Sequence, residues 1–375
     1  MCLQEEIDKT SKEIFADSYP MSIGELMSLY KDDELDIHPE FQRVFRWSLL
    51  QKSKLIESIL LGIPLPSIFV SQRNDGVWDV IDGVQRLSTI FEFIGIFKDE
   101  NGNILPASRL LKTKYLPSLE GKVWESDEES NSLTNAQRIN FKRSKINIQI
   151  IRKESDPNIK FELFQRLNSL GTSLSDQELR NCLLIMLNRD FYYWLKELAN
   201  YEPFLSSLCL TDRVLEEQYN LELALRFIIF KNVTEEELKD IKGLTYLGEF
   251  LTDKMIQYAK SEVFNKENEA RVFKNTFDFI NNTLGENAFK RYNTERNKFE
   301  GKFLLSSFEA VGIGIGSNIE NWISKTVDTK LIEDLTARAN SLWSDNTYLR
   351  NIGSGVHFNV RILAIVPLGK KIFRP

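Results

Sequence analysis

The spacing of hydrophobic residues in the first half of the chain is strand-like in some segments and helix-like in others. Short runs rich in β-branched and aromatic residues predict strands at residues 67–71, 77–81 and 146–151. Hydrophobic residues at helical spacing predict helices at residues 48–61 and from Gln85 onward, and residues 99–134 are expected to be an irregular insertion. Strand and helix signals mixed in this way indicate an α+β region.

The second half of the chain has an almost wholly helical pattern beyond about residue 200. A capping box at residues 175–178 predicts one long helix that continues to residue 199. The run VGIGIGSN, residues 311–318, lacks the spacing of a dinucleotide-binding loop and is interpreted as a flexible helix connection. The run VRILAIV, residues 360–366, is strand-like. We expect a first domain over residues 1–190 and an α-helical domain over residues 191–375.

Composition and charge narrow the class of protein. The scattered Cys2, Cys182 and Cys209 indicate neither a disulfide framework nor a cysteine zinc cluster, and no run is long enough for a membrane helix, so a cytoplasmic protein is expected. The net charge of −6 argues against a chain that coats nucleic acid, although a local basic face remains compatible with it. Only His38 and His357 are available, which excludes histidine-rich metal sites and an HNH nuclease within this chain.

The most informative stretch is VIDGVQRLSTI, residues 80–90, where a predicted strand meets a predicted helix. Free N–H groups at a helix start favour an anion, and Gly83 permits close approach of a ligand. Arg86 would fork onto a phosphate, Gln85 would donate to it or position a water, and Asp82 would hold Mg²⁺ or orient Arg86. The simpler alternative is an ordinary turn, with Asp82 as the helix cap and Arg86 on the surface.

Two other segments carry candidate ligand-binding residues. The loop FQRVFRW places Gln42, Arg43 and Arg46 among aromatic residues, where the arginines would bind phosphate or lie solvated over the edge of the core. In FELFQRLNSLG, Asn168 follows an apolar helical stripe and either faces a cleft or is a surface residue near a helix end.

A basic stretch, residues 137–153, is the candidate nucleic-acid contact. It would neutralise DNA phosphates through Arg138, Lys142, Arg143 and Lys145. The alternative is a solvated helix face that offsets the neighbouring acidic run ESDEES.

Four segments in order carry a family resemblance: IHPEFQRVFRW, LIESILLGIPLPSIFV, WDVIDGVQRLSTI and FELFQRLNSLGTSLSDQELRN. Together they resemble the N-terminal domain family of GmrSD-type restriction endonucleases, which has a ParB/sulfiredoxin-like fold and a DGQQR motif. The resemblance implies a small mixed sheet and a nucleotide pocket lined by Asp82, Gly83, Gln85 and Arg86. It also implies that Gln42 and Arg43 approach from the preceding loop and that Asn168 completes the wall.

The resemblance further implies binding of a nucleoside triphosphate (ATP or GTP) with Mg²⁺, in a restriction or anti-phage system that acts on DNA or through a partner nuclease. Val84 departs from the family pattern because it replaces the first glutamine of the motif, so binding without hydrolysis is an open alternative. That alternative describes a non-catalytic DNA- or protein-binding module. Val84 also stands where sulfiredoxins carry their catalytic cysteine, which argues against a cysteine-based reductase. No Walker A motif occurs.

Overall fold

The computed structural model describes residues 16–37, 47–99, 101–152, 176–241, 247–353 and 355–375. Contacts within the chain divide it into two compact units, Met1–Leu174 and Ser175–Pro375. This division precedes the boundary expected from the sequence, so the helix that begins at Asp176 lies in the second unit.

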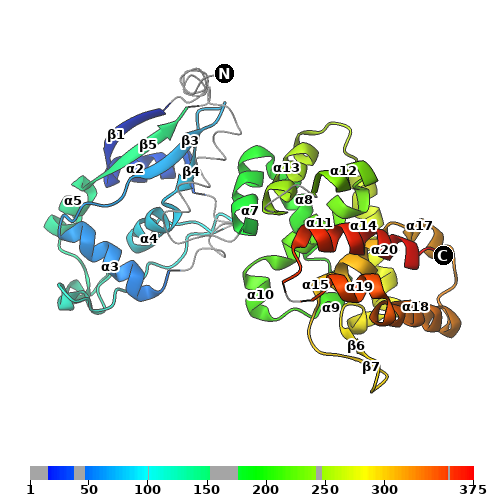
Figure 1. The fold of residues 1–375 in the computed structure, drawn as a ribbon. Helices are drawn as coiled ribbons and strands as arrows, with labels where there is room; N and C mark the ends of the chain where they lie inside the picture. The colour runs from blue at the N-terminus through cyan, green and yellow to red at the C-terminus, as the bar shows by residue number, and fades with distance from the viewer. Residues whose placement is uncertain (1–15, 38–46, 100, 153–175, 242–246, 354) are drawn as a thin grey trace. The chain divides into compact units, whose positions relative to one another are not determined.

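The first unit is built on a five-stranded mixed sheet with the strand order β1-β5-β3-β4-β2 (Figure 1). Its strands are β1 (Ala16–Ser22), β2 (Leu35–Asp36), β3 (Ile68–Gln72), β4 (Trp78–Asp82) and β5 (Lys145–Ile151). β3 runs antiparallel to β4 and parallel to β5, while β1 closes one edge antiparallel to β5. The three strands expected from the sequence are confirmed. β1 gave no clear signal because Pro20 interrupts it, which an edge strand tolerates.

The sheet is accompanied by helices α2 (Ile23–Lys31), α3 (Leu49–Leu60), α4 (Val84–Ile94) and α5 (Asn135–Arg143). Reciprocal capping boxes start α2, α3 and α5, at Ser22, Ser48 and Thr134 respectively. The hydrophobic stripe of α4 is fully buried, with Leu87, Ile90, Phe91 and Phe93 all 0% exposed. The start of α4 is therefore held in a fixed place at the end of β4.

The segment between α4 and α5 is irregular, as expected, and contains two short 3₁₀ turns, η2 (Pro117–Leu119) and η3 (Glu129–Asn131). The carboxylate of Glu57 on α3 accepts hydrogen bonds from the backbone N–H groups of Tyr115 and Leu116, each at 2.9 Å. A hydrogen bond from the Thr113 side chain and these two backbone bonds lower the pKa of Glu57. An ion pair of 2.6 Å between Lys52 and Glu92 joins α3 to α4.

The second unit is largely helical. Its first helices are α7 (Asp176–Leu187), α8 (Arg189–Ala199), α9 (Glu202–Leu208), α10 (Asp212–Glu216), α11 (Tyr219–Asn232), α12 (Glu235–Asp240), α13 (Leu247–Lys260) and α14 (Lys266–Thr283). A short hairpin follows, formed by β6 (Arg291–Asn293) and β7 (Lys298–Glu300). The remaining helices are α15 (Leu305–Ser307), the π-helix η6 (Phe308–Gly312), α16 (Ile313–Gly316), α17 (Ile319–Trp322), α18 (Thr329–Ser341), α19 (Asn346–Asn351) and α20 (Phe358–Ile372). The expected α+β region followed by a helical region is confirmed.

Three details of the second unit correct the sequence predictions. The helix expected through residue 199 breaks at Asn188, whose extended backbone and side chain cap α8. The run at residues 360–366 is helical, because packing of Ile362, Ile365 and Val366 in the core overrides their strand preference. The glycine-rich run is a buried helical element and not a flexible connection: a Cβ on Gly314 would lie 2.5 Å from the carbonyl oxygen of Gly369 on α20. Over the described residues, no helix is long and apolar enough to cross a membrane.

Candidate functional site

The candidate site is the β4–α4 junction, residues 82–86, where the last residue of β4 leads through Gly83 into α4. Gly83 is the N-cap of α4, and within the described part of the chain no side chain caps this helix. The first N–H groups of a helix lack partners within the helix itself, so this end of α4 favours an anion. Asp82 therefore does not act as the helix cap, and that part of the ordinary-turn interpretation was wrong.

Gly83 is required at the junction for two separate reasons. Its φ of +101° lies in the region that side-chain-bearing residues rarely adopt. A Cβ at this position would also lie 2.8 Å from Cγ1 of Ile68, the first residue of β3. The sharp turn and the close approach of the Ile68 side chain to the Gly83 backbone thus both depend on the missing side chain.

Arg86 is buried, with 9% of the residue exposed, so the surface position that the ordinary-turn alternative gave it was also wrong. Its Nη2 donates to Oδ2 of Asp82 at 2.8 Å. Its Nη1 donates to the backbone carbonyl oxygens of Pro66 and of Ser67, the latter at 3.1 Å. Burial lowers the pKa of Arg86, and Asp82 opposes that shift. The guanidinium group thus links the residues just before β3 to the start of α4, and Asp82 holds the guanidinium in this orientation.

The carbonyl groups of Pro66 and Ser67 are parts of the site that the sequence did not reveal. Their only signal was the segment IPLPS, whose two prolines mark irregular backbone. Carbonyl groups in such a segment lack sheet partners and are available to a buried guanidinium. Ile68 was missed for a similar reason, since its contact with Gly83 depends on the pairing of β3 with β4.

Gln85 connects the junction to the segment that contains the arginines of FQRVFRW. Its Oε1 accepts a hydrogen bond of 3.2 Å from the backbone N–H of Trp47, the last residue of that segment. The end of the loop and the start of α4 are therefore neighbours, although they are far apart in sequence. Gln42, Arg43, Arg46 and Asn168 lie outside the described residues.

Val84 is the first residue of α4 and is only 5% exposed. An apolar side chain there packs into the core and offers neither a donor nor an acceptor for a water molecule. Further along α4, Ser88 and Thr89 are buried, and their hydroxyl groups have no hydrogen-bond partner within the described part of the chain. Within residues 84–86, Gln85 is thus the only position whose side chain supplies an amide.

A Mg²⁺ ion bound with a nucleotide commonly takes one or two protein carboxylates, with phosphate and water completing its shell. Asp82 fits this requirement: its side chain is 36% exposed, its contact with Arg86 is made through Oδ2, and Oδ1 would be the oxygen that holds the ion. Among the described residues there is no cluster of three or more His, Cys, Asp or Glu side chains suited to a metal ion. The exposed carboxylate of Asp82 therefore fits a metal ion that arrives with phosphates.

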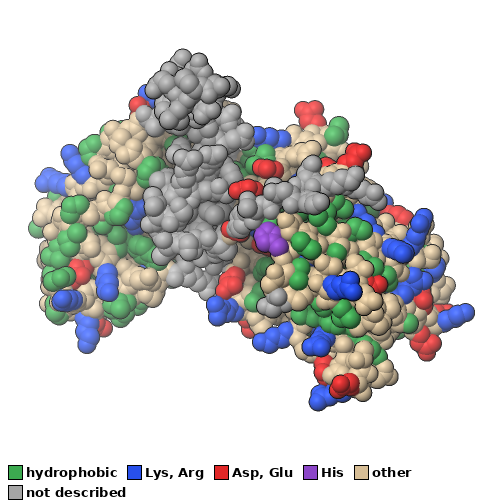
Figure 2. All heavy atoms as spheres, in the orientation of Figure 1, with side chains coloured by type: hydrophobic (Ala, Val, Ile, Leu, Met, Phe, Trp, Pro, Cys, Tyr) green, Lys and Arg blue, Asp and Glu red, His purple; other side chains and the backbone are tan. Residues whose placement is uncertain are grey.

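Of the four basic residues expected to contact DNA, one forms an ion pair within the protein and three are exposed. Arg138 forms an ion pair of 2.8 Å with Glu125, so much of its charge is already compensated. Lys142, Arg143 and Lys145 are exposed at the end of α5 and the start of β5, with Lys142 over the ring of Trp124. Figure 2 shows Lys and Arg side chains together at this edge of the first unit. Three of the four expected residues thus remain available to a phosphate backbone.

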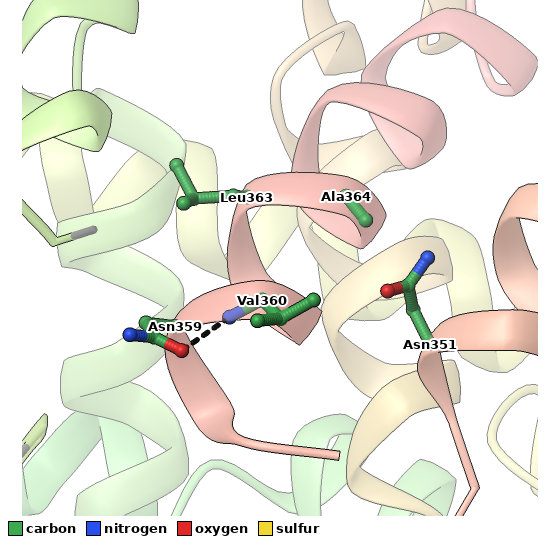
Figure 3. A pocket seen from close by; sticks show the side chains of 5 residues that line it. All are labelled: Asn351, Asn359, Val360, Leu363 and Ala364. Atoms are coloured by element: carbon green, nitrogen blue, oxygen red, sulfur yellow. Dashed lines mark hydrogen bonds between the residues drawn. The ribbon is translucent and has the colours of Figure 1, made fainter.

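The second unit contains a hollow of about 480 Å³ between α19 and α20 (Figure 3). Asn351, Asn359, Val360, Leu363 and Ala364 line it, and Asn359 Oδ1 accepts a hydrogen bond of 2.7 Å from the backbone N–H of Val360. The lining is mostly apolar, and none of these five side chains is charged. The lining thus offers no positive charge to a phosphate group, and none of the residues expected from the sequence is among these five.

The β4–α4 junction lies within a segment that matches a known class of protein, the restriction endonucleases. A family model described as GmrSD restriction endonuclease, N-terminal domain, matches residues 23–185. This segment therefore belongs to the GmrSD N-terminal domain family, as the ordered motifs indicated, and membership implies a component of a restriction system. The comparisons find no match among curated proteins or among solved structures.

Proposed function

We propose that the first unit binds a nucleoside triphosphate, ATP or GTP, with Mg²⁺ at the β4–α4 junction, as part of a restriction or anti-phage system. The observation that carries this proposal is the start of α4, where the N-cap residue Gly83 has no side chain to cap the helix and lies next to the carboxylate of Asp82. The N–H groups of α4 would hold a phosphate, and Asp82 would hold the metal that accompanies it. Arg86 would fix the junction in shape and add positive charge near the phosphates.

Hydrolysis would need a polar side chain to position the attacking water, and Val84 supplies none at the start of α4. Gln85 would have to position the attacking water, yet its Oε1 already accepts a hydrogen bond from Trp47. The second candidate function is therefore a module that binds nucleotide, DNA or protein without turnover. The burial of Val84 is the specific observation that favours it.

Calorimetric titration with ATP and with GTP, in the presence and absence of Mg²⁺, tests the nucleotide proposal. Wild type is expected to bind one of them in a Mg²⁺-dependent manner, and nucleotide at 100 times Kd would add about 2.7 kcal/mol of stability. Asp82→Asn is expected to weaken Mg²⁺-dependent binding at least about tenfold, equivalent to about 1.4 kcal/mol. Asp75→Asn is the matched control: Asp75 lies in the β3–β4 turn, where its Oδ1 accepts a hydrogen bond from Val77 N–H that asparagine can also accept.

Steady-state phosphate release separates the two candidate functions. Turnover by wild type supports an NTPase, and binding without turnover supports the non-catalytic module. If only the Val84→Gln variant hydrolyses nucleotide, the absence of hydrolysis in the wild type is due to Val84. Absence of both binding and thermal stabilisation with either nucleotide would refute the proposal.

DNA is the proposed macromolecular partner of the exposed basic group formed by Lys142, Arg143 and Lys145. Replacing all three with glutamine is expected to weaken duplex binding and to reduce the salt dependence of log K by about 1 per lost phosphate contact. The control replaces Lys54, Lys112 and Lys114, which are other lysines of the same unit. Fluorescence anisotropy at several salt concentrations provides the measurement. Equal effects of the two triple variants, or no binding by wild type, would contradict this assignment.

A further inference from the structure

Hairpin β6–β7 forms a two-stranded sheet of its own in the second unit, outside the residues 23–185 that the family model matches. It projects from the helices of that unit (Figure 1). The N–H of Leu304 donates to the carbonyl oxygen of Phe289 at 2.9 Å, and the ring centroids of Phe289 and Phe303 lie 6.1 Å apart. Phe289 is only 1% exposed. The hairpin is therefore a projecting ribbon whose base is anchored in the core.

The tip of the hairpin is held in one shape by its own side chains. Oδ1 of Asn293 accepts hydrogen bonds from the backbone N–H groups of Glu295 and Arg296, at 3.0 and 3.1 Å. Across the two strands, the ring centroids of Tyr292 and Phe299 lie 5.1 Å apart, with an angle of 60° between the rings. Asparagine bonds of this kind stabilise turns, and cross-strand aromatic pairs stabilise hairpins. A ligand would thus meet a ribbon that is already in shape.

The ribbon is basic, although the chain as a whole is acidic. Residues 290–302 contain five basic side chains and two acidic ones, a net charge of +3, whereas the whole chain carries −6. The strand register places Arg291 and Lys298 on one face of the ribbon and the rings of Tyr292 and Phe299 on the other. The hairpin therefore has a charged face and an aromatic face.

The positive charges of the ribbon are only weakly compensated. The carboxylate of Glu300 lies 3.5 Å from Nη1 of Arg296 and 3.8 Å from Nζ of Lys298, whose side chains are 68% and 59% exposed. Ion pairs as long and exposed as these contribute little to stability. The closest donor to Glu300 is Nδ2 of Asn293, at 2.6 Å, and this bond lowers the pKa of Glu300. Arg296 and Lys298 can therefore turn to another anion at little cost.

The shape and the charge of the ribbon together fit duplex DNA. The major groove of B-form DNA is about 12 Å wide, and it admits a two-stranded β-ribbon. Phosphates along both edges of the groove would then face the basic side chains. The major groove of an A-form RNA duplex is deep and narrow, so side chains do not read it. The ribbon therefore fits duplex DNA better than duplex RNA.

We propose that hairpin β6–β7 is a DNA-contacting ribbon, which enters the major groove of duplex DNA while its basic side chains neutralise the flanking phosphates. The side chains that would do so are Arg291, Arg296, Lys298 and Lys302. Arg291 is held over the ring of Trp343, 5.8 Å from its centroid, a contact that uses the charge of the guanidinium and not its hydrogen-bond donors. The ribbon adds a DNA contact in the second unit to the proposed function, and it requires no nucleotide.

Fluorescence anisotropy of a short DNA duplex, titrated with the full chain at several salt concentrations, tests the ribbon. Replacing Arg296, Lys298 and Lys302 with glutamine is expected to weaken binding at least about tenfold and to reduce the salt dependence of log K by about 0.9 for each lost contact. All three side chains are exposed, so the variant is expected to fold.

The matched control replaces one arginine and two lysines that are exposed elsewhere in the second unit, namely Lys330, Lys371 and Arg374, with glutamine. It removes the same charge from the chain and is expected to keep an affinity and a salt dependence close to those of the wild type. Equal losses in the two triple variants would overturn the ribbon, because bulk charge alone would then explain binding.

Asn293→Ala tests the shape of the ribbon separately from its charge. It keeps every charged side chain but removes the two bonds that hold the turn. Because a preformed ribbon has less ordering to do on binding, the variant is expected to weaken DNA binding at least about threefold. Unchanged affinity would overturn the proposal, as would equal affinity of the wild type for a DNA duplex and an RNA duplex of the same length.

The outcome is separable from the other proposals. DNA binding that is lost only when Lys142, Arg143 and Lys145 are replaced would overturn the ribbon and leave the contact of the first unit in place. Absence of duplex binding by the wild type would overturn both DNA contacts, whereas nucleotide binding is measured independently by calorimetry.

Discussion

Alanine at position 83 is expected to lower the free energy of unfolding of the first unit by about 2–6 kcal/mol. About 1–3 kcal/mol would come from holding alanine at a φ of +101°. About 1–3 kcal/mol would come from the overlap of the new Cβ with Ile68, 2.8 Å away. Because the overlap would push β3 away from the start of α4, nucleotide binding is expected to be lost as well. Urea denaturation and calorimetric titration provide the two measurements.

Gly76→Ala is the matched control for this prediction. Gly76 has a φ of +93° in the turn between β3 and β4, and no atom of the described residues lies within 4 Å of the position that an alanine Cβ would occupy. The destabilisation caused by Gly76→Ala therefore measures the cost of backbone strain without a steric overlap. The difference between the two variants isolates the contact with Ile68, and equal destabilisation by both would contradict the proposed close approach.

Replacement of Arg86 by methionine is expected to have the second large effect. The variant keeps a long, unbranched side chain but removes the donors to Asp82, Pro66 and Ser67. Loss of these charged hydrogen bonds is expected to destabilise the first unit by about 2–4 kcal/mol. Nucleotide affinity is expected to fall at least about tenfold, since the junction would lose both its clamp and a positive charge.

Arg73→Met separates loss of stability from loss of binding. Arg73 also pairs with carboxylates in the first unit, Asp36 at 2.6 Å and Asp79, but it follows β3 and contacts neither α4 nor its N-cap through these bonds. This variant is expected to destabilise the unit and to retain nucleotide affinity at temperatures where it is folded. If Arg73→Met and Arg86→Met weakened binding to the same extent, the role of Arg86 would be stability alone.

The geometry of Arg86 changes how the motif is understood. An arginine one turn into a helix, beside an Asp-Gly pair, suggested a side chain that reaches out to a phosphate. In the structure its guanidinium turns inward and is shared between Asp82 and two backbone carbonyl groups. Under the proposed function, the groups that would bind phosphate at the junction are then the backbone N–H groups of α4, whose position Arg86 maintains.

The sequence alone determined the local elements and the location of the candidate site. Alternating or β-branched runs gave β3, β4 and β5, and the helical stripe that includes Leu87 and Ile90 gave α4. The use of glycine at position 83 was also evident, because a strand that turns at once into a helix often requires unusual backbone angles. These features depend on residues that are close together in the sequence, so the spacing of residue types predicts them directly.

Only the tertiary structure decided which groups meet. The carbonyl oxygens that hold Arg86 come from about 20 residues earlier in the chain, and the carboxylate that holds Arg180 comes from Glu222. The helical state of residues 360–366 was decided by burial against distant helices, which outweighed the preference of isoleucine and valine for strands. Hydrophobic spacing reports which face of an element is buried, but a hydrogen bond or ion pair between distant segments exists only once the sheet register and helix packing have brought its two atoms together.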